Sequence, residues 1–339
     1  MLAKRIGRYT ICFDQPVAVK GFASVVGKKE GEGPLAEHFD YISEDTTFGE
    51  KTWEKSESRM QKDTLTRALN KAAVTPDTVD IIFAGDLLNQ CIGTNYGLRD
   101  FGIPFFGLYG ACSTMAESLS LASVFVDSGS VNIAAALTSS HFCSAERQYR
   151  FPLEYGGQRT PNSQWTVTGS GSVILSRDGD GPFIKEITVG KITDLGIKDA
   201  NNMGAAMAPA AAETIEAYFK DTSQKPSDFD LIVTGDLGLV GHRLLIELLE
   251  KDGIQVNPDK FNDCGMMIFD LENQDVHAGG SGCGCSASVL CSYILNSMRC
   301  GKLHEVLFTA TGALMSPMST QQGESIPSIA HLIHFSTKK

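Results

Sequence analysis

The sequence has few basic residues for its acidic ones and no long apolar segment. It contains 29 lysines and arginines against 40 aspartates and glutamates, which gives a formal net charge of −11. This charge argues against a nucleic-acid partner, because such proteins usually carry a basic patch. No stretch approaches the roughly 20 apolar residues that a membrane-spanning helix needs. We therefore expect no transmembrane segment, and any connection to a membrane must go through a partner.

The cysteines show neither a disulfide framework nor a metal-binding spacing. There are nine of them, an odd number, and no signal peptide precedes them. This usage predicts a reduced, intracellular protein. The pair Cys283 and Cys285 lacks the second pair that a zinc site needs. We therefore predict no resident metal from the cysteines.

A repeated pattern dominates what is present. Residues 80–87 (DIIFAGDL) and 230–237 (DLIVTGDL) match almost position for position, and each follows a helical pattern, over 53–73 and 210–219. Later, GACS at 110–113 and CGCS at 283–286 each open a segment of small residues. Because both features recur in the same order, the sequence predicts a duplicated α/β unit.

Cys112 lies in a turn, residues 109–119, that leads into a predicted helix. The apolar residues before it, 101–108, predict a short buried strand. A cysteine on the first turn of a helix meets the positive end of the helix dipole, which lowers the thiol pKa and favours the thiolate. The pattern is typical of an acyl-accepting nucleophile. The alternative is a buried cysteine that packs as a small apolar residue.

With this cysteine and this duplication, the chain resembles the thiolase superfamily, in particular the 3-oxoacyl-carrier-protein synthase III family. Cys112 matches the family's nucleophile. Residues 168–175, 282–288 and 311–314 match its glycine-rich segments. The resemblance implies a layered αβαβα fold of two pseudo-symmetric halves, each with a mixed five-stranded sheet, and a homodimer. It places the halves at 1–178 and 179–339, with an insertion at 142–168 that serves as a cap or a subunit contact.

The chain differs from this family at two catalytic positions. Gly235 and Cys283 occupy the positions of the family's histidine and asparagine. Those donors stabilise the oxyanion, and each contributes about 3–4 kcal/mol to such a reaction. His242 or His277 could replace one of them. The departures imply a degenerate condensing-enzyme site in which Cys112 is vestigial.

The match is closer still to the stage V sporulation protein AD family of spore-forming bacteria, in residues 9–11, 85–90 and 277–286. This resemblance implies binding of dipicolinate, alone or with calcium, and its uptake into the developing spore. It implies a cytoplasmic protein, peripherally associated with the spore inner membrane, that works with integral membrane SpoVA proteins.

We expect the first turns of two helices, at Cys112 and near Cys285, to hold the two ligand carboxylates. Calcium could bridge Asp86 and Asp236 to the ligand. Otherwise these two aspartates are loop or helix caps. The predicted ligand-binding residues are Asp86, Cys112, Ser113, Asp236, Ser281, Cys283, Cys285 and Ser286.

Two other functions stay open at this point. The first is an active acyltransferase or 3-oxoacyl synthase, acylated on Cys112 from a coenzyme A or carrier-protein thioester. The second is a scaffold whose site is idle and whose surface docks membrane partners.

Overall fold

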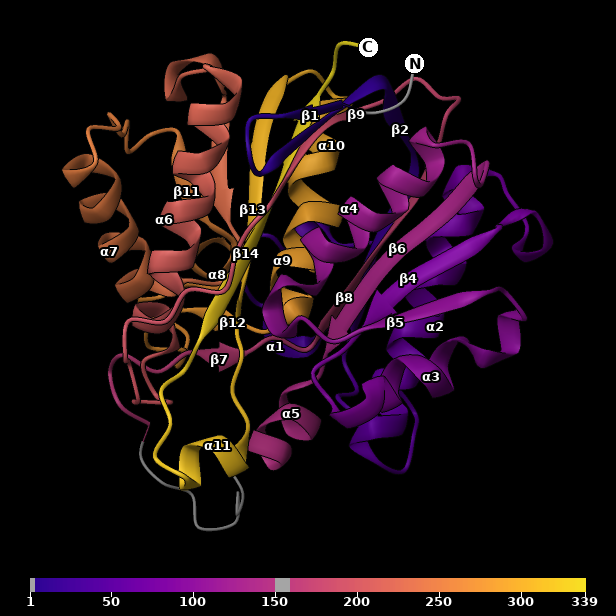
Figure 1. Cartoon of the computed structure of the whole chain (residues 1–339). Helices are drawn as coiled ribbons and strands as arrows, with labels where there is room; N and C mark the ends of the chain where they lie inside the picture. The colour runs from indigo at the N-terminus through magenta and orange to yellow at the C-terminus, as the bar shows by residue number, and fades with distance from the viewer. Residues whose placement is uncertain (1–3, 150–158) are drawn as a thin grey trace.

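Twelve strands join in one mixed sheet in the computed structural model, which describes residues 4–149 and 159–339 (Figure 1). The order along its main path is β11-β10-β13-β14-β9-β2-β8-β6-β4-β5, and β1 and β3 pair with β2. The short strands β7 and β12 pair with each other. The strands are β1 (Lys4–Ile6), β2 (Thr10–Gly27), β3 (Tyr41–Ser43), β4 (Ile81–Gly85), β5 (Phe105–Leu108), β6 (Ile133–Ser140), β7 (Trp165–Thr166), β8 (Gly169–Ser176), β9 (Phe183–Val189), β10 (Leu231–Thr234), β11 (Phe261–Asp263), β12 (Gly280–Ser281), β13 (Glu305–Ala313) and β14 (Ser328–Ser336).

The helices lie outside and between the two halves of this sheet. They are α1 (Lys28–Gly31), α2 (Trp53–Ala72), α3 (Ile92–Leu98), α4 (Thr114–Asp127), α5 (Phe142–Tyr149), α6 (Met203–Thr222), α7 (Gly238–Lys251), α8 (Cys264–Met267), α9 (Cys283–Val289), α10 (Leu295–Arg299) and α11 (Pro317–Gln321). Two short 3₁₀ turns matter below, η3 (Asn89–Cys91) and η5 (Ala111–Ser113). Over the described residues, no helix is long and apolar enough to cross a membrane.

Ten of the twelve strands form two sets of five with the same topology. In the first, β4 is parallel to β5 and β6, β6 is antiparallel to β8, and β8 is antiparallel to β2. In the second, β10 is parallel to β11 and β13, β13 is antiparallel to β14, and β14 is antiparallel to β9. The predicted duplicated fold with a mixed five-stranded unit in each half is therefore confirmed, and the two units are joined into one sheet by the pairing of β2 with β9. The division of the chain at residue 178 stays a prediction.

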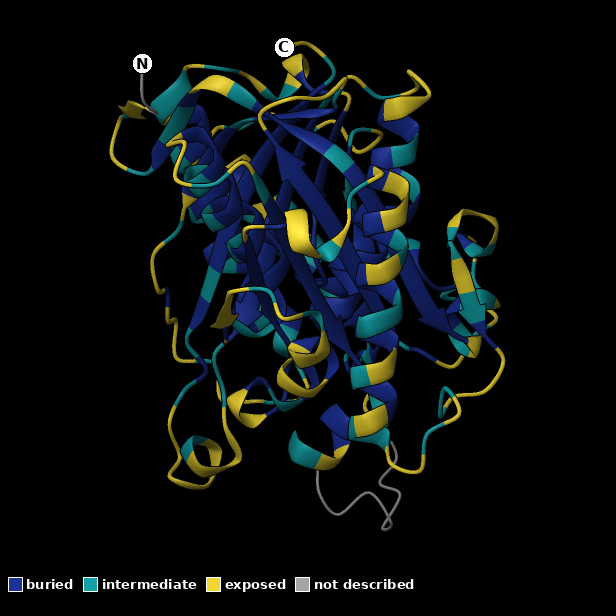
Figure 2. Ribbon diagram, turned by 90° about the vertical axis from the view of Figure 1, so that its right-hand side faces the viewer, coloured by how far each residue is buried: buried dark blue, intermediate teal, exposed yellow. Residues whose placement is uncertain are grey.

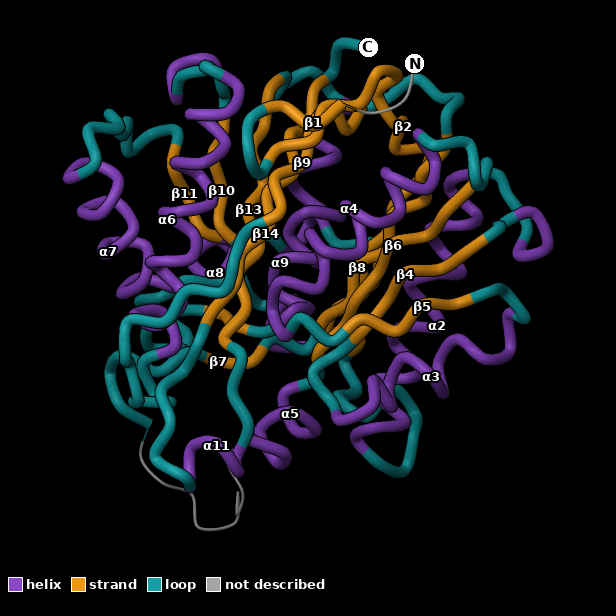
Figure 3. The backbone as a smooth tube through the Cα atoms, in the orientation of Figure 1, coloured by secondary structure: helices purple, strands orange, loops and turns teal. Residues whose placement is uncertain are grey.

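Helices form three layers around these sheets. α4 contacts β4 and β6 of the first set and also β13 and β14 of the second, and α9 packs beside it on β8 and β6 (Figure 3). α2 covers the outer face of the first set, and α6 covers β13 and β14 of the second. This order of helix, sheet, helix, sheet and helix is the predicted αβαβα arrangement.

The central layer explains the glycine-rich motifs. All residues of α9 and β8 are buried, and so are those of β6 except Ile133. Figure 2 shows most of the strands in the dark blue of buried residues. A Cβ atom on Gly284 would lie 2.2 Å from the carbonyl oxygen of Gly169, and one on Gly171 would lie 2.2 Å from that of Ala287. Only residues without a side chain let helix and strand approach this closely. The small residues of 168–175 and 282–288 are therefore a packing requirement.

The strand predicted from 101–108 is present as β5, but it is not buried. It lies at the end of the strand order with a neighbour on one side only. Phe105 and Phe106 are 36% and 52% exposed. The prediction of a buried strand is wrong because apolar sequence does not reveal whether a further strand follows in the sheet.

Candidate functional site

A cavity of about 660 Å³, including its open mouth, lies where the two halves meet. Its walls come from η5, α5, β7, β12, the start of α6 and the end of β13. The lining residues are Leu87, Ala111, Cys112, Ala145, Glu146, Tyr149, Thr166, Ala200, Asn201, Met203, Ser281, Gly282, Ala313 and Met315. Most of these side chains are apolar, so the cavity suits an apolar body with a few polar groups.

Cys112 is at the floor of this cavity, on the 3₁₀ turn η5 just before α4. The preceding Ala111 has a left-handed backbone, with φ of 53°. Gly312 lies directly behind the turn, and a Cβ atom there would be 2.4 Å from the carbonyl oxygen of Gly110. The glycine of 311–314 therefore makes room for the strained turn that presents the cysteine.

The surroundings of Cys112 keep its thiol protonated. Burial raises its pKa well above the usual range, and the Asp236 carboxyl group beside it acts in the same direction. The expected thiolate is wrong because burial and a neighbouring acid outweigh the helix dipole. A thiol in this state is a poor nucleophile at neutral pH.

Asp236 occupies the helix end that we expected a ligand to use. It is fully buried and accepts hydrogen bonds from the Gly282 amide (2.8 Å), from Thr311 Oγ1 (3.3 Å) and from the Cys112 thiol. The Gly284 amide, in the same turn, donates to Ser140 Oγ (3.1 Å). Burial raises the pKa of Asp236 to about 7. These two amides at the start of α9 are thus bonded to the protein itself.

The structure brings together some of the predicted ligand-binding residues. Cys112 and Ser281 line the cavity. Cys283 belongs to the same apolar cluster as Cys112, and its thiol donates to the Ser139 carbonyl (2.9 Å). Asp236 does not line the cavity but bonds to Cys112 and Gly282, which do. Contact of any of them with a ligand stays a prediction.

The others lie away from the cavity and bond to nearby groups. Asp86 is fully buried and accepts from the amides of Thr94 (2.7 Å) and Leu88 (2.8 Å). The remaining three bond to main-chain carbonyls: Ser113 Oγ to Gly110 (2.7 Å), Cys285 Sγ to Gly235 (3.6 Å) and Ser286 Oγ to Cys283 (3.4 Å).

Asp86 and Asp236 do not form a calcium cage. Calcium takes six to eight oxygen ligands. Within the described ranges, no three or more of His, Cys, Asp and Glu gather as metal ligands would. Both Asp86 oxygens already accept hydrogen bonds, and so do both Asp236 oxygens.

The wall residues of α5 were missed by the sequence patterns. Glu146 is buried and accepts from Thr166 Oγ1 (2.9 Å). The Tyr149 hydroxyl donates to the Leu87 carbonyl (2.7 Å). Both belong to the insertion predicted at 142–168, whose residues 150–158 lie outside the described part. No repeat or known motif marked them, and only the unusual length of the insertion pointed to this segment.

No histidine takes the place of the missing one at the described lining of the cavity. His242 is on α7 beside Asp263, and burial lowers its pKa. His277 lies 3.4 Å from an Asp275 oxygen. Among the described residues, the lining also holds no lysine or arginine.

Known proteins resemble this chain at two levels. The family model described as "Stage V sporulation protein AD (SpoVAD)" matches residues 7–336. The stage V sporulation protein AD of Bacillus subtilis (strain 168) is 46% identical over 332 residues, which are 98% of each chain.

Solved structures of low identity share the fold. The 3-oxoacyl-[acyl-carrier-protein] synthase III from Aquifex aeolicus VF5 has a TM-score of 0.59 and 15% identity, and the match covers 94% of this chain and 99% of that one. The E117Q variant of OleA from Xanthomonas campestris has a TM-score of 0.60 and 13% identity, over 96% and 99%.

Proposed function

The chain belongs to the stage V sporulation protein AD family, and from this premise we propose that its cavity binds dipicolinate together with calcium. The family gives the chain a role in sporulation on a thiolase-like fold. We propose further that binding serves the uptake of dipicolinate into the developing spore, at the inner membrane and with integral membrane SpoVA proteins as partners.

The cavity is the observation that carries this proposal. Dipicolinate is a flat ring with two carboxylates, so it needs apolar walls and a few donors. Leu87, Met203 and Met315 can contact the ring, and Asn201 and Ser281 can donate to its carboxylates. A small, mostly apolar cavity with few polar groups is the usual form of a small-molecule site.

Charge favours the calcium complex over the free dianion. The lining includes Glu146, and Asp236 bonds to Cys112 and Gly282 of the lining. A doubly negative ligand would meet these acids, whereas a complex with one calcium ion is neutral. In this proposal calcium arrives with the ligand as cargo, because Asp86 and Asp236 do not fit a resident ion.

A binding function without catalysis agrees with the protonation state of Cys112, the residue that matches the nucleophile of the synthase III family. The Cys112 thiol is protonated, and the described lining holds no histidine that could take its proton. A condensing reaction needs both an activated thiol and oxyanion donors.

Isothermal titration calorimetry tests this function. We expect saturable binding of dipicolinate in the presence of calcium and at least about tenfold weaker binding without it. Ala200→Trp, which fills the cavity from its half-buried rim, should abolish binding, and Glu250→Gln, on the exposed side of α7, should not change it. Binding that is absent, or that is the same in Ala200→Trp, would exclude the cavity as the site. Absence of any binding would support the scaffold alternative.

We also propose a homodimer that forms through β5. The strand is at the edge of the sheet and exposes Phe105 and Phe106. Such an apolar edge favours pairing with a second copy. Analytical ultracentrifugation of the parent should show a dimer, and Phe105→Glu should shift it to the monomer. A monomeric parent would contradict the proposal.

An acyltransferase is the second candidate, because Cys112 remains at the floor of an apolar cavity. Asp236 would then accept the thiol proton as the Cys112 sulfur forms the new thioester, and would return it to the coenzyme A sulfur that leaves when its own thioester breaks. Incubation with acyl-coenzyme A followed by intact-mass analysis decides between the two. A stable adduct on the parent that is absent from Cys112→Ala would favour the transferase.

A further inference from the structure

We propose that Glu57, a buried carboxyl group on α2, positions helix α5 and thereby controls the shape of the cavity wall and the affinity for its ligand. Glu57 does not line the cavity, so it acts through the helix above it. The part of this inference that concerns ligand affinity rests on the proposed function. The part that concerns α5 does not.

The contact between Glu57 and α5 is direct. Glu57 is fully buried, and its Oε2 accepts a hydrogen bond from Ser144 Oγ at 2.7 Å. Its Oε1 accepts one from Ser139 Oγ, at the end of β6, at 3.0 Å. Ser144 is followed by Ala145 and Glu146, which both line the cavity. The carboxyl group therefore holds α5 immediately behind the wall that a ligand would touch.

The end of α5 is held by the turn after β4. Gln148 Nε2 donates to the Leu87 carbonyl (2.9 Å), as Tyr149 does, and Gln148 Oε1 accepts from the Asn89 amide (3.0 Å). Leu87 itself lines the cavity. Asp86, which precedes it, is the group that fixes this turn through the Leu88 amide. Glu57 and Asp86 thus support the two parts of the same wall.

The two carboxyl groups share one small space. A Cβ atom on Gly93 would lie 3.3 Å from Asp86 Oδ2 and 3.3 Å from the Glu57 carboxyl carbon. Two buried carboxylates this close cannot both ionise without a large penalty. Burial, with the Asp86 charge second, raises the pKa of Glu57 to about 8.

The other titratable groups around Glu57 do not relieve this penalty. Cys91 in η3 and Cys283 at the start of α9 are acids as well, and burial raises the pKa of both. Arg147 on α5 forms an ion pair with Glu54 on α2. Both members of that pair are partly exposed, so solvent screens them.

Ser144 can adapt to either state of Glu57. When Glu57 is neutral, its proton can be donated to the Ser144 hydroxyl, which then donates to the His141 carbonyl at 3.1 Å. When Glu57 is ionised, Ser144 donates to it, but two negative charges then lie behind the wall. The hydrogen bonds from Ser144 and Ser139 favour the ionised form, but burial and the Asp86 charge outweigh them. Ionisation therefore favours exposure of Glu57 to solvent by displacement of α5, and alkaline pH should loosen this helix.

Hydrogen-exchange mass spectrometry and calorimetry with calcium and dipicolinate, from pH 6.5 to 9.5, test this inference. In the parent we expect faster exchange of the α5 peptide above pH 8, after correction for intrinsic rates, and an affinity about tenfold lower at pH 9 than at pH 7. Glu57→Gln keeps the hydrogen-bonding shape without the charge, so the exchange of α5 should stay flat. Its affinity should keep only the change that Asp236, with a pKa of about 7, causes. Glu250→Gln should behave as the parent.

Ser144→Ala removes the contact and should give fast exchange of α5 at every pH. The inference is overturned if Glu57→Gln retains the pH dependence of the parent, or if Ser144→Ala leaves the exchange of α5 unchanged. A parent that binds no calcium and dipicolinate at any pH would reject the proposed function alone, because the exchange measurement still decides the role of Glu57. Should Glu57→Gln fail to fold, the Ser144→Ala arm gives the decision.

Discussion

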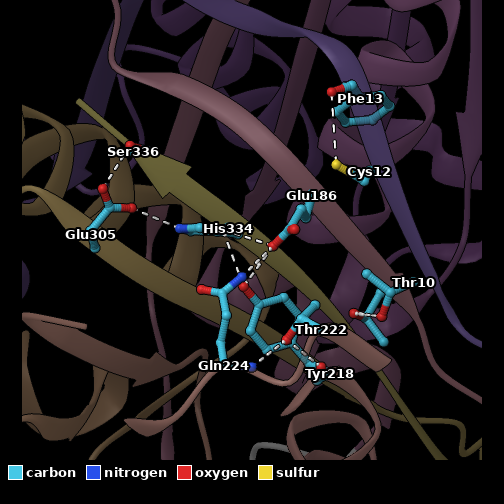
Figure 4. A network of polar contacts seen from close by, with 11 residues as sticks. Thr10, Cys12, Phe13, Glu186, Tyr218, Thr222, Gln224, Glu305, His334 and Ser336 are labelled. Carbon is cyan, nitrogen blue, oxygen red and sulfur yellow. Dashed lines mark hydrogen bonds and ion pairs between the residues drawn. The ribbon is translucent and has the colours of Figure 1, made fainter. Parts of the chain in front are cut away.

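Buried and partly buried carboxyl groups gather in two regions of this chain, and their pKa values shift in opposite directions. Far from the cavity, Glu186 and Glu305 flank His334, whose Nδ1 and Nε2 lie 2.9 and 2.8 Å from their oxygens (Figure 4). At the cavity, Glu57 faces Asp86, and Asp236 is bonded to amide, hydroxyl and thiol groups.

The presence of a cation makes the difference. Burial alone would raise the pKa of Glu186, but hydrogen bonds from His334 and Tyr218 outweigh it, so the pKa is lowered. His334 responds in turn: burial would lower its pKa, yet the two glutamates raise it. For Glu57 and Asp236 burial prevails, and both pKa values rise.

The comparison separates a stabilising network from a candidate functional one. Glu186 is on β9, Glu305 on β13, His334 on β14 and Tyr218 on α6, so the charged network ties four elements of the second half together (Figure 4). Unpaired buried acids destabilise a fold, and groups with such raised pKa values gather at functional sites. The carboxyl groups at the cavity have such raised pKa values, so this region is the candidate functional one.

The largest effect should come from removing the shared cation. His334→Ala leaves two glutamates without their partner, and we expect a loss of about 3 kcal/mol in the free energy of unfolding. Because the pKa of His334 is raised, its contribution is fully present below pH 6.5 and is lost as the pH rises through the raised value. Urea unfolding at pH 6 measures it, with Glu250→Gln as the control. A loss below about 1 kcal/mol would mean that the network around His334 does not stabilise the fold, and the contrast with the cavity region would fail.

Removing a charge at the cavity should increase the free energy of unfolding, whereas His334→Ala decreases it. The raised pKa of Asp236 means that the folded state loses stability as the pH rises from about 4 to about 7. Asp236→Asn cannot ionise, so we expect it to be more stable than the parent at pH 8, by a margin about 2 kcal/mol larger than at pH 5. Unfolding curves at the two pH values check this. A variant less stable than the parent at pH 8 would contradict the assignment.

A smaller change should appear on the acid side. The lowered pKa of Glu186 means that its contribution is present above about pH 4.5 and is lost as the pH falls through the lowered value. Glu186→Gln should therefore flatten the acid limb of the stability curve by about 1 kcal/mol. Thermal unfolding from pH 3 to 6 measures the limb. An identical limb in parent and variant would place the acid sensitivity elsewhere.

The smallest effect should come from the rim of the charged network. Ser336 Oγ donates to Glu305 Oε1 at 2.9 Å, in a partly buried position (Figure 4). Ser336→Ala should reduce the free energy of unfolding by about 0.5–1 kcal/mol, the usual value for one hydrogen bond to a group with other partners. The same urea titration gives this number. A loss as large as that of His334→Ala would mean that Ser336 is essential to the network.

The fold could be predicted from the sequence because its signals are local and repeated. The matching segments 80–87 and 230–237 became β4 and β10, at equivalent places in the two strand sets. The segment 283–286 became the start of α9, where close packing on β8 requires small residues. Patterns of this kind depend on neighbours along the chain or on the duplication itself.

The properties of the site depend on distant residues, and these were harder to predict. The dipole argument for Cys112 used only its own helix, whereas Asp236 from the other half and burial decide its protonation. The wall of α5 is set by Glu57 and Leu87, which lie far from it in sequence. No periodicity along the chain brings such groups together.

The antiparallel pairing of β2 with β9 has a consequence for any attempt to divide this molecule. β2 comes from the first strand set and β9 from the second, and they pair at Thr10–Cys12 and again at Val17–Ala18. A polypeptide cut between Ser176 and Phe183 would leave each piece with a long bare edge of main-chain donors and acceptors. Two such fragments should reassociate with each other or self-aggregate through these edges. Neither should persist as a stable, separately folded half.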